Sequence, residues 1–398
     1  MTRGVLPVQR IRVLELRSVR GTGGGPEKTI MLGAAQANRA TFDVIVCYIR
    51  DRRDDIFRLD ERAAGLNIPY VEVHERHSFD VGIWPQLRRI VNEHQIDIVH
   101  AHDYKTNVIA WLMGKRMGVI PLSTSHGWAG ESARERWVYY PADKRLLAHF
   151  PRVVAVSSTI RQILLDHGGH ADRIVLLLNA IDSDDFKRVE GRRETMRREL
   201  GYPPDQFVVG AVGRLHPVKR FDLLMEAFAA LTPSHPQLRL AIVGDGSLRP
   251  ELEAHAARLK ITDRCALLGH RTDLVDLYQA FDMVVQSSES EGAPNAVLEA
   301  MAMEAPLVAT DVGGTRELAT PDVHALIIPR HDVPAMTRAI ASIVDQPEAA
   351  RTRAQAARRH VEADLSFRAR TRRLEALYEE LVRTRDAVGA IRGVQDHA

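Results

Sequence analysis

Two glutamates stand eight residues apart in QSSESEGAPNAVLEAMAMEAPLVATDVGGT, residues 286–315. Glu291 precedes a glycine and a proline, which predicts a loop, and Glu299 falls within the helix predicted to follow. A carboxylate beside the start of a helix can accept hydrogen bonds from sugar hydroxyls, while exposed amides of residues such as Asn295 can bind an anion. The pattern suits a sugar phosphate. The alternative is an exposed loop glutamate and a helix glutamate that pairs with a nearby base.

A basic turn in GAVGRLHPVKRFDLL is the second candidate. A predicted strand ends at Gly213, and Arg214, Lys219 and Arg220 follow before the next predicted helix. Cations at the carboxyl end of a strand can meet phosphates, and an arginine with a lysine can neutralise a diphosphate and stabilise it as it departs. A solvated basic turn without a ligand explains the same pattern.

Glycine turns mark two further candidate sites. Gly313 and Gly314 follow a predicted strand, where a glycine pair lets backbone amides approach a ligand; the alternative is a plain tight turn. Near the N-terminus, Gly24 and Gly25 belong to GTGGGPE, which opens the first helix directly after the first strand and again suits an anion. This run lacks the third glycine of a dinucleotide-binding fingerprint, and the chain contains neither a Walker A motif nor an HExxH pair.

Three histidines form the last candidate group. His100 and His102 lie in one predicted strand, and His126 closes another, just before a glycine. A histidine at a strand end can hydrogen-bond a sugar hydroxyl or an acceptor. A metal site made by the three histidines and a purely structural role are the alternatives. We predict no metal site here.

Short apolar runs alternate with amphipathic stretches and predict the elements that must position these residues. The first half contains seven such runs, from RVLELRSV to IVLLLN, and the second half contains six, from FVVGAVG to ALIIPR. This alternation is typical of βαβ units around a parallel sheet. The predicted fold class is therefore α/β, with two doubly wound, Rossmann-like domains facing across a cleft that holds the site.

The turn GYPP at residues 201–204 is the predicted domain boundary. An N-terminal domain is expected over residues 1–190, a C-terminal domain over 200–365 and a one-faced surface helix over 366–387, with the last ten or so residues frayed. A chain of 398 residues exceeds the usual size of a single core, which agrees with two domains.

Composition excludes several classes of protein. Hydrophobic residues at 45% and a net charge of +2 fit a globular chain and do not indicate nucleic-acid binding. No apolar run is long enough for a transmembrane helix, and the N-terminus lacks a signal-peptide pattern. The two cysteines, Cys47 and Cys265, lie in separate apolar runs and predict no disulfide. We expect a cytoplasmic protein.

Taken together, the paired glutamates, the basic turn and the final glycine turn resemble motifs of the family 4 retaining glycosyltransferases, which have the GT-B fold. EGAPNAVLEAMA is similar to their E-x7-E segment, with Glu291 and Glu299 as its acids, and GRLHPVKRFD to their phosphate turn. TGGGPE and SHG resemble the first-domain motifs more loosely. The chain departs from the family at Ala180, where a glycine is usual, and at residues 293–295, a variant that leaves the sugar specificity open.

The resemblance implies a site for a nucleotide-sugar donor. Its expected contacts are the diphosphate with Arg214 and Lys219, the ribose with Glu299, the transferred sugar with Glu291 and His126, and the phosphates with Gly313 and its neighbours. It also implies front-face attack, in which the acceptor hydroxyl enters on the side from which the diphosphate leaves. The two cations would take the place of a metal ion, so no cofactor is expected. The tail helix would return to the first domain.

The acceptor is expected to be a glycan or a lipid-linked sugar, used in polysaccharide or glycoconjugate synthesis. ESARERWVYYPADKRLLAHFPRVV gathers basic and aromatic residues that could rest on an anionic membrane, or simply cover the first core as a solvated helix. Two other functions stay open: a GT-B sugar-nucleotide epimerase, and a catalytically silent nucleotide-sugar sensor or scaffold. A glycoside hydrolase fits less well, because the two glutamates are not on opposed strand ends.

Overall fold

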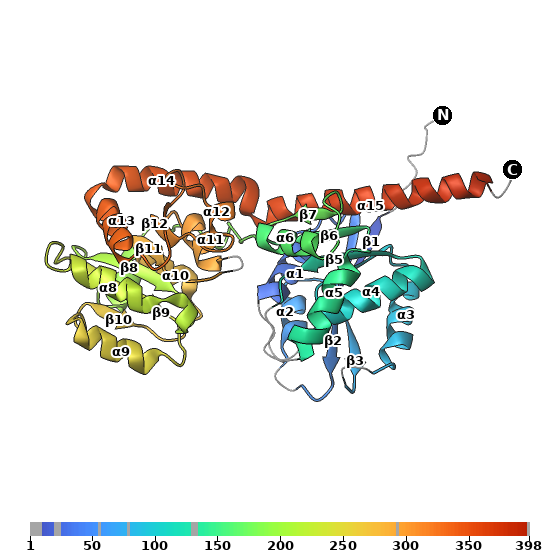
Figure 1. The fold of residues 1–398 in the computed structure, drawn as a ribbon, viewed down its shortest axis with the longest axis horizontal. Helices are drawn as coiled ribbons and strands as arrows, with labels where there is room; N and C mark the ends of the chain where they lie inside the picture. The colour runs from blue at the N-terminus through green and yellow to red at the C-terminus, as the bar shows by residue number, and fades with distance from the viewer. Residues whose placement is uncertain are drawn as a thin grey trace. The chain divides into compact units, whose positions relative to one another are not determined.

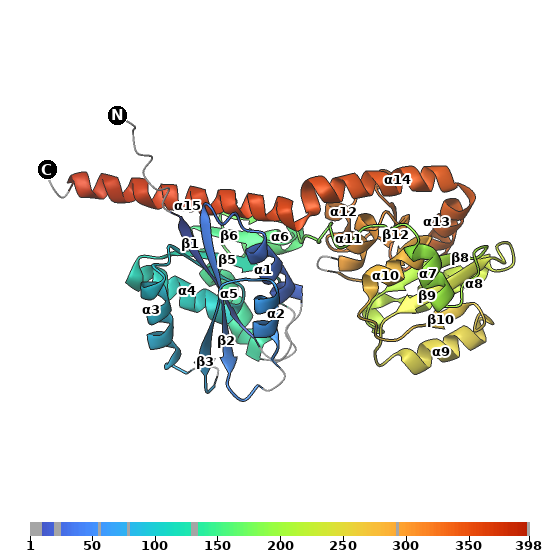
Figure 2. The same cartoon turned by 180° about the vertical axis from the view of Figure 1, so that it is seen from behind.

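The structure, a computed structural model, describes residues 10–19, 25–54, 57–77, 80–128, 134–291 and 294–395. It divides into two compact units: the first comprises Met1–Asn179 and Phe367–Ala398, and the second comprises Ala180–Ser366. The division falls ahead of the turn at residues 201–204, which lies inside the second unit. Each unit contains one parallel sheet with helices on both faces (Figures 1 and 2), so the prediction of an α/β fold with two Rossmann-like domains is confirmed.

The first unit contains a seven-stranded sheet in the order β3-β2-β1-β4-β5-β6-β7 (Figure 1). Its strands are β1 (Ile11–Ser18), β2 (Phe42–Asp51), β3 (Tyr70–Glu75), β4 (Ile98–Ala101), β5 (Ile120–Ser125), β6 (Arg152–Ala155) and β7 (Ile174–Leu176). Its helices are α1 (Gly25–Ala35), α2 (Leu59–Gly65), α3 (Ile83–Glu93), α4 (Tyr104–Met117), a π-helical turn η1 (Glu135–Tyr139), α5 (Tyr140–Leu147), α6 (Ser158–Asp166) and α15 (Phe367–Gln395).

Apolar side chains cover both faces of this sheet, as strands that are continuous hydrophobic runs require. One face packs against α3, α4, α5 and α6, with Leu87 and Met113 fully buried. The other face packs against α1, α2 and the tail helix α15, through Met31 and Tyr378 among others. The tail helix runs to Gln395, beyond its predicted end at residue 387, since no proline interrupts the stretch.

The second unit contains a six-stranded sheet in the order β10-β9-β8-β11-β12-β13. Its strands are β8 (Phe207–Val212), β9 (Leu238–Val243), β10 (Cys265–Leu267), β11 (Met283–Gln286), β12 (Leu307–Thr310) and β13 (Leu326–Ile328). Its helices are α7 (Arg192–Glu199), a 3-10 turn η2 (Pro217–Lys219), α8 (Phe221–Leu231), α9 (Arg249–Arg258), α10 (Leu274–Ala280), α11 (Asn295–Ala302), α12 (Thr315–Leu318), α13 (Val333–Asp345), α14 (Pro347–His360) and a π-helical turn η3 (Val361–Leu365).

The segment that opens the second unit is fixed by one partly buried arginine. The Arg188 guanidinium donates to the carbonyl oxygens of Tyr278, Gln279, Phe281 and Met303 at distances of 2.7 to 3.0 Å. These carbonyls lie at the ends of α10 and α11, where a helix leaves its last acceptors unpaired. Arg188 therefore ties the end of the segment expected as the N-terminal domain, residues 1–190, to the second unit.

Two of the exclusions made from the sequence can be examined in the structure. Cys47 and Cys265 are both free thiols. Within the described ranges, no helix combines the length and the apolar character that crossing a membrane requires.

Candidate active site

The strand order of the second sheet reverses between β8 and β11, which are hydrogen-bonded neighbours. Open α/β sheets bind ligands at such a point, outside the carboxyl ends of the strands. The loop after β8 covers residues 213–220, and the loop after β11 begins at Ser287. These loops carry the basic turn and the first of the paired glutamates, so the fold brings both motifs to one edge of the sheet.

An ion pair joins the two loops. Lys219 Nζ lies 2.6 Å from Glu291 Oε1, and Ser288 Oγ donates to the same oxygen at 2.6 Å. The side chains of Lys219 and Glu291 are 24% and 14% exposed. The sequence predicted these two residues from separate motifs, and the structure places them in direct contact.

Further hydrogen bonds hold the loops together. Ser287 Oγ donates to the carbonyl oxygen of Lys219 at 2.7 Å, and the amide of Glu289 donates to the carbonyl oxygen of Val218 at 2.8 Å. From β12, Thr310 Oγ1 donates to the carbonyl oxygen of Ser288 at 2.7 Å. Sequence reasoning missed these hydroxyl groups. For Ser287 and Ser288, the position directly after a buried strand, in the run QSSES, was the available signal, whereas Thr310 is the last residue of a strand.

Arg214 has a different environment from Lys219. Its side chain is exposed, and within the described part of the chain it makes no hydrogen bond or ion pair. The backbone around it is closely packed, because a Cβ at Gly244 would lie 1.9 Å from the carbonyl oxygen of Gly213. A Cβ at Gly246 would lie 2.4 Å from the carbonyl oxygen of Leu215. The two glycines of VGDG thus fix the loop backbone, while the Arg214 guanidinium stays accessible to an anion.

Glu299 lies in α11, and its Oε2 accepts a hydrogen bond of 2.9 Å from the Tyr278 hydroxyl. Burial and the Glu299 carboxylate raise the pKa of Tyr278 well above its usual value, so the phenol stays protonated and acts as the donor. Asn295 is the first residue of α11 and is exposed. The buried Tyr278 hydroxyl therefore holds the Glu299 carboxylate in place. The sequence did not single out this tyrosine.

The glycine turn follows β12, the strand next to β11. Gly313 is exposed and has a φ of 49°, a left-handed conformation that favours glycine. Gly314 is buried and precedes α12. The glycine turn therefore lies beyond the carboxyl end of β12, next to the strand β11 whose following loop carries Glu291.

The predicted residues of the first unit lie at the strand ends of the other sheet. Gly25 is the first residue of α1, while Gly24 lies outside the described residues. His126 directly follows β5, and its Nε2 lies 3.2 Å from His102 Nδ1. Burial, followed by the neighbouring His102 and Arg17, lowers the pKa of His126 well below its usual value. His126 is therefore a neutral imidazole at neutral pH.

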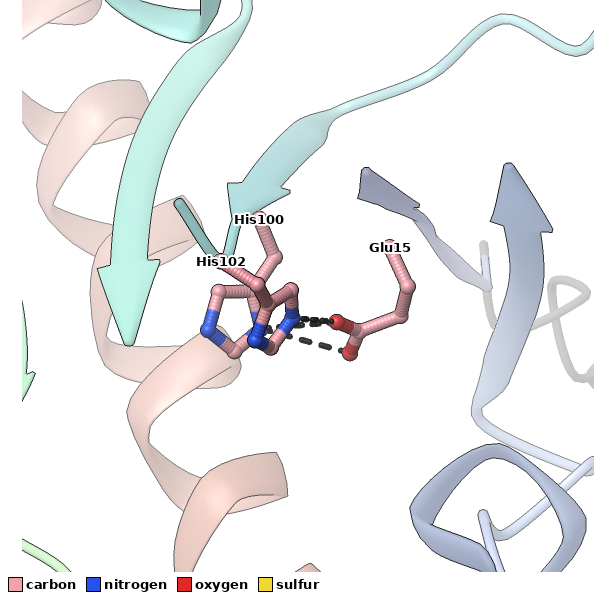
Figure 3. Close-up of side chains that lie close together, drawn as sticks. All are labelled: Glu15, His100 and His102. Atoms are coloured by element: carbon pink, nitrogen blue, oxygen red, sulfur yellow. Dashed lines mark hydrogen bonds and ion pairs between the residues drawn. The ribbon is translucent and has the colours of Figure 1, made fainter. Parts of the chain in front are cut away.

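His100 and His102 surround a buried carboxylate (Figure 3). Glu15 in β1 is paired in register with His100 in β4, and the alternation of a strand puts His102 on the same face. His102 Nε2 lies 2.5 Å from Glu15 Oε2, and His100 Nδ1 lies 3.2 Å from Glu15 Oε1. Tyr378 of α15 donates to the same Oε1 at 2.7 Å. The sequence drew attention to the histidines but not to Glu15 or Tyr378.

The possible metal site differs from the one considered from the sequence. Among the described residues, the group whose donor atoms could surround an ion is Glu15, His100 and His102, all within 4.8 Å of one another, and His126 is not part of it. The same atoms already make directional hydrogen bonds to each other, to Tyr378 and to other neighbours. Hydrogen bonding therefore accounts for the cluster without an ion.

Comparison with known families identifies the class of protein. The family model described as Glycosyl transferases group 1 matches residues 192–360, and the model described as Glycosyltransferase Family 4 matches residues 23–185. The two matched regions contain most of both sheets. The chain belongs to the family 4 glycosyltransferases and is a glycosyltransferase.

Individual relatives agree with this assignment. D-inositol 3-phosphate glycosyltransferase of Saccharomonospora viridis is 29% identical over a region that covers 75% of this chain and 72% of the relative. UDP-Gal:alpha-D-GlcNAc-diphosphoundecaprenol alpha-1,3-galactosyltransferase of Escherichia coli is 26% identical, with 65% and 69% covered. Among solved structures, Anabaena HepE in complex with UDP has a TM-score of 0.79 at 21% identity, covering 93% of this chain and all of that one. The last match supports the fold alone.

Proposed function

We propose that this glycosyltransferase transfers a sugar from a nucleoside diphosphate sugar to a hydroxyl acceptor, with retention of configuration and without a metal ion. The Lys219–Glu291 ion pair at the reversal point of the second sheet carries the proposal. It places a cation for a diphosphate beside a carboxylate for sugar hydroxyls, in a position where α/β folds bind ligands.

Each predicted residue then has a role in the proposal. Arg214 and Lys219 bind the diphosphate and stabilise its growing charge as it leaves, which is the part that a metal ion would otherwise play. Glu299 binds the ribose, and Glu291 binds the transferred sugar. Amides near Asn295 and the glycine turn at residues 313–314 contact the phosphates.

His126 and the loop containing Gly24 and Gly25 are the proposed contributions of the first unit. His126 contacts the transferred sugar, and the glycines at the start of α1 approach the donor phosphates. The acceptor hydroxyl attacks the anomeric carbon on the face from which the diphosphate leaves. The new C–O bond forms as the old one breaks, and a leaving phosphate oxygen takes the hydroxyl proton, so no protein base is needed.

A thermal-shift titration with UDP, GDP and ADP, and with their common sugars, tests this proposal. A nucleotide at a hundred times its dissociation constant should stabilise the protein by about 2.7 kcal/mol. UDP is a sensible first probe, because Anabaena HepE has been solved with it. We expect one nucleotide to stabilise the chain equally with and without magnesium.

A matched pair of variants identifies the binding residues. In the Arg214→Ala, Lys219→Ala double variant, the stabilisation by nucleotide should disappear. The Arg351→Ala, Arg359→Ala variant removes the same charge from two exposed arginines of α14 and should keep it. If no nucleotide stabilised the wild-type protein, or if magnesium were required, the proposal would be wrong in its donor or its metal independence, respectively.

The acceptor is proposed to be a glycan or a lipid-linked sugar, reached by peripheral contact with an anionic membrane. Trp137 and Val138 of η1 are 76% and 58% exposed, and Arg134 and Arg145, before and after them in the sequence, are exposed cations. An exposed tryptophan with flanking basic residues suits a lipid headgroup layer. Sedimentation with phosphatidylglycerol vesicles should fall for Trp137→Ser but not for Val323→Ser, a similarly exposed apolar residue of the second unit. Equal binding by both variants would refute the contact.

A further inference from the structure

A chain of hydrogen bonds leads from the buried carboxylate of Glu15 to His126. Glu15 Oε2 meets His102 Nε2 at 2.5 Å, and the other nitrogen of the same ring, Nδ1, meets His126 Nε2 at 3.2 Å. Figure 3 shows the first step, with the imidazoles of His100 and His102 directed at the carboxylate. Each ring nitrogen of a neutral histidine is either a donor or an acceptor, so this chain can hold only certain arrangements of protons.

The charge of Glu15 fixes the first proton. Burial alone would raise the pKa of Glu15, but the charges and hydrogen bonds of His100 and His102 outweigh it and lower the pKa well below the usual carboxyl range. An ionised carboxylate only accepts hydrogen bonds, so His102 must carry its proton on Nε2. Burial, followed by His100, lowers the pKa of His102 to about 4, which leaves Nδ1 unprotonated at neutral pH.

The lone pair on His102 Nδ1 then fixes the proton of His126. His126 Nε2 must donate to it, and because His126 is also neutral, its Nδ1 carries a lone pair. In the part of the chain that the structure describes, no group hydrogen-bonds to His126 Nδ1. This nitrogen is thus an unoccupied hydrogen-bond acceptor at the end of β5.

We propose that Glu15 and His102 are positioning residues that hold His126 in the tautomer protonated on Nε2, so that Nδ1 accepts a hydrogen bond from a hydroxyl of the transferred sugar. The identity of the ligand rests on the proposed function. The tautomer does not, because the protein fixes it before any ligand binds. A carboxylate that orients a histidine through its second nitrogen is a general device for selecting a tautomer.

The tail helix supplies part of this arrangement. Tyr378 of α15 donates to Glu15 Oε1 at 2.7 Å and accepts from His100 Nδ1 at 2.8 Å, while His100 Nε2 accepts from Thr124 Oγ1 at 2.8 Å. Glu15 therefore receives hydrogen bonds from three buried donors and cannot turn away from His102. The positive charges of Arg17 in β1 and Arg370 in α15 also lower the pKa of His126 and so oppose its protonation.

A metal ion at Glu15, His100 and His102 would give the opposite result. His102 would then bind the ion through an unprotonated Nε2, and its proton would have to be on Nδ1. His126 Nε2 would become the acceptor and its Nδ1 the protonated nitrogen. The tautomer of His126 therefore distinguishes the hydrogen-bonded cluster from a metal site.

Nuclear magnetic resonance of the full-length protein labelled with 15N-histidine measures this tautomer directly. Two-bond 1H–15N correlation spectra at pH 7.5 would be recorded before and after treatment with EDTA, and the His126 signals assigned by their loss in His126→Gln. We expect a proton on Nε2, none on Nδ1, and no effect of EDTA. A proton on Nδ1, or a tautomer that reverses when Zn²⁺ is added, would overturn the inference.

The variant His102→Gln separates positioning from folding. Its side-chain amide can still donate to Glu15 from the place of Nε2, but it has no lone pair in the place of Nδ1. We expect a mixture of His126 tautomers and a kcat/KM for sugar transfer about five- to tenfold lower, the usual effect of one hydrogen bond. The affinity for UDP, GDP or ADP, which lack the sugar, should not change.

Thr124→Val is the matched control, because it removes a partner of His100 and leaves both hydrogen bonds of the Glu15–His102–His126 chain in place. We expect it to keep the His126 tautomer and the rate of sugar transfer. An unchanged His126 tautomer in His102→Gln would refute the positioning role. If the wild-type protein bound no nucleotide, the proposed function would fail, while the tautomer measurement would still decide the inference about Glu15 and His102.

Discussion

The two sheets place carboxylates at corresponding points but in different surroundings. The order of strands reverses between β1 and β4 in the first sheet and between β8 and β11 in the second. In the second unit, Glu291 and Lys219 lie in loops beyond the strand ends and remain partly exposed. In the first unit, Glu15 lies within a strand, is 6% exposed and is bound by three side chains.

Because of this difference, substitutions at the two sites should change the free energy of unfolding by different amounts. A partly exposed ion pair contributes at most about 1 kcal/mol to folding, so loop residues can be devoted to a ligand. A buried carboxylate that satisfies several donors is coupled to the stability of its whole unit. We therefore expect substitutions at the loops to change the rate of transfer, and substitutions in the cluster to change stability first.

The largest expected effect is that of Glu15→Ala. It leaves the donors of His102 and Tyr378 buried without an acceptor, which should lower the free energy of unfolding of the first unit by about 3–5 kcal/mol. All four tryptophans belong to the first unit, so urea unfolding followed by tryptophan fluorescence reports on that unit. Glu93→Ala, at an exposed glutamate of α3, should cost less than about 0.5 kcal/mol. Equal losses in both variants would contradict the comparison.

Lys219→Ala should reduce the rate of sugar transfer strongly while changing the stability little. Loss of a cation that stabilises the leaving diphosphate should reduce kcat/KM by about 10²–10³-fold, measured as release of sugar from the donor. The free energy of unfolding should change by less than about 1 kcal/mol, because the Lys219–Glu291 pair is partly exposed. Arg351→Ala serves as the control for both measurements. A large loss of stability with little loss of rate would make Lys219 a structural residue.

The fold could be predicted from the sequence because buried parallel strands are uninterrupted apolar runs. Each of the thirteen runs forms a strand, and α15 carries its buried residues Leu374, Leu377 and Leu381 at the expected helical spacing. The division between the units was harder to predict. The predicted boundary was the turn at residues 201–204, whereas the second unit begins at Ala180 and includes α7. The buried Arg197 of α7 donates to Asp282 and to backbone carbonyls of the second unit.

The candidate sites could be predicted only where a short motif contains the residues. Lys219 and Glu291 each belong to such a motif, but their contact depends on the conformation of two loops, which Ser287 and Ser288 help to fix. Glu15 is a single acid in an apolar strand, and its partner Tyr378 is 363 residues away. No local pattern connects two such residues, so their contact required the structure. The roles of the individual donor residues stay predictions.

Lowering the pH should decrease the free energy of unfolding of the first unit. The pKa of His102 is about 4 in the folded chain, against about 6.5 for a free histidine. As the pH falls below 6.5, the unfolded chain gains a proton that folded His102 does not. Stability therefore falls between about pH 6.5 and 4, by on the order of 3 kcal/mol in total for this group.

His126, whose folded pKa is also lowered, acts in the same direction. Glu15 stabilises the unit above its unfolded pKa, and its contribution is lost only as the pH falls through its still lower folded value. Tryptophan-detected urea unfolding at several pH values between 7.5 and 4.5 measures the slope. His102→Gln should make it shallower, whereas the exposed-site variant His94→Gln should leave it unchanged. An equally steep slope in His102→Gln would contradict the assignment.

The smallest expected effect concerns Tyr278. Its buried hydroxyl donates to a carboxylate of the second unit, as the Tyr378 hydroxyl does in the first. The Tyr278 hydroxyl is fully buried and donates to Glu299 at 2.9 Å, so Tyr278→Phe should lower the free energy of unfolding by about 1–2 kcal/mol. If Glu299 binds the ribose, loosening this carboxylate should also weaken nucleotide binding by a few-fold. Tyr202→Phe is the matched control, because the Tyr202 hydroxyl makes no hydrogen bond with the described residues.

Circular dichroism for stability and titration with UDP for affinity would separate the two consequences of Tyr278→Phe. A loss of stability alone would place Glu299 outside the nucleotide site and make its bond to Tyr278 purely structural. A loss of affinity in Tyr278→Phe but not in Tyr202→Phe would show that the second unit, like the first, uses a buried side chain to orient a residue that contacts the ligand. The contrast between the units would then be one of degree, set by how many buried donors each carboxylate satisfies.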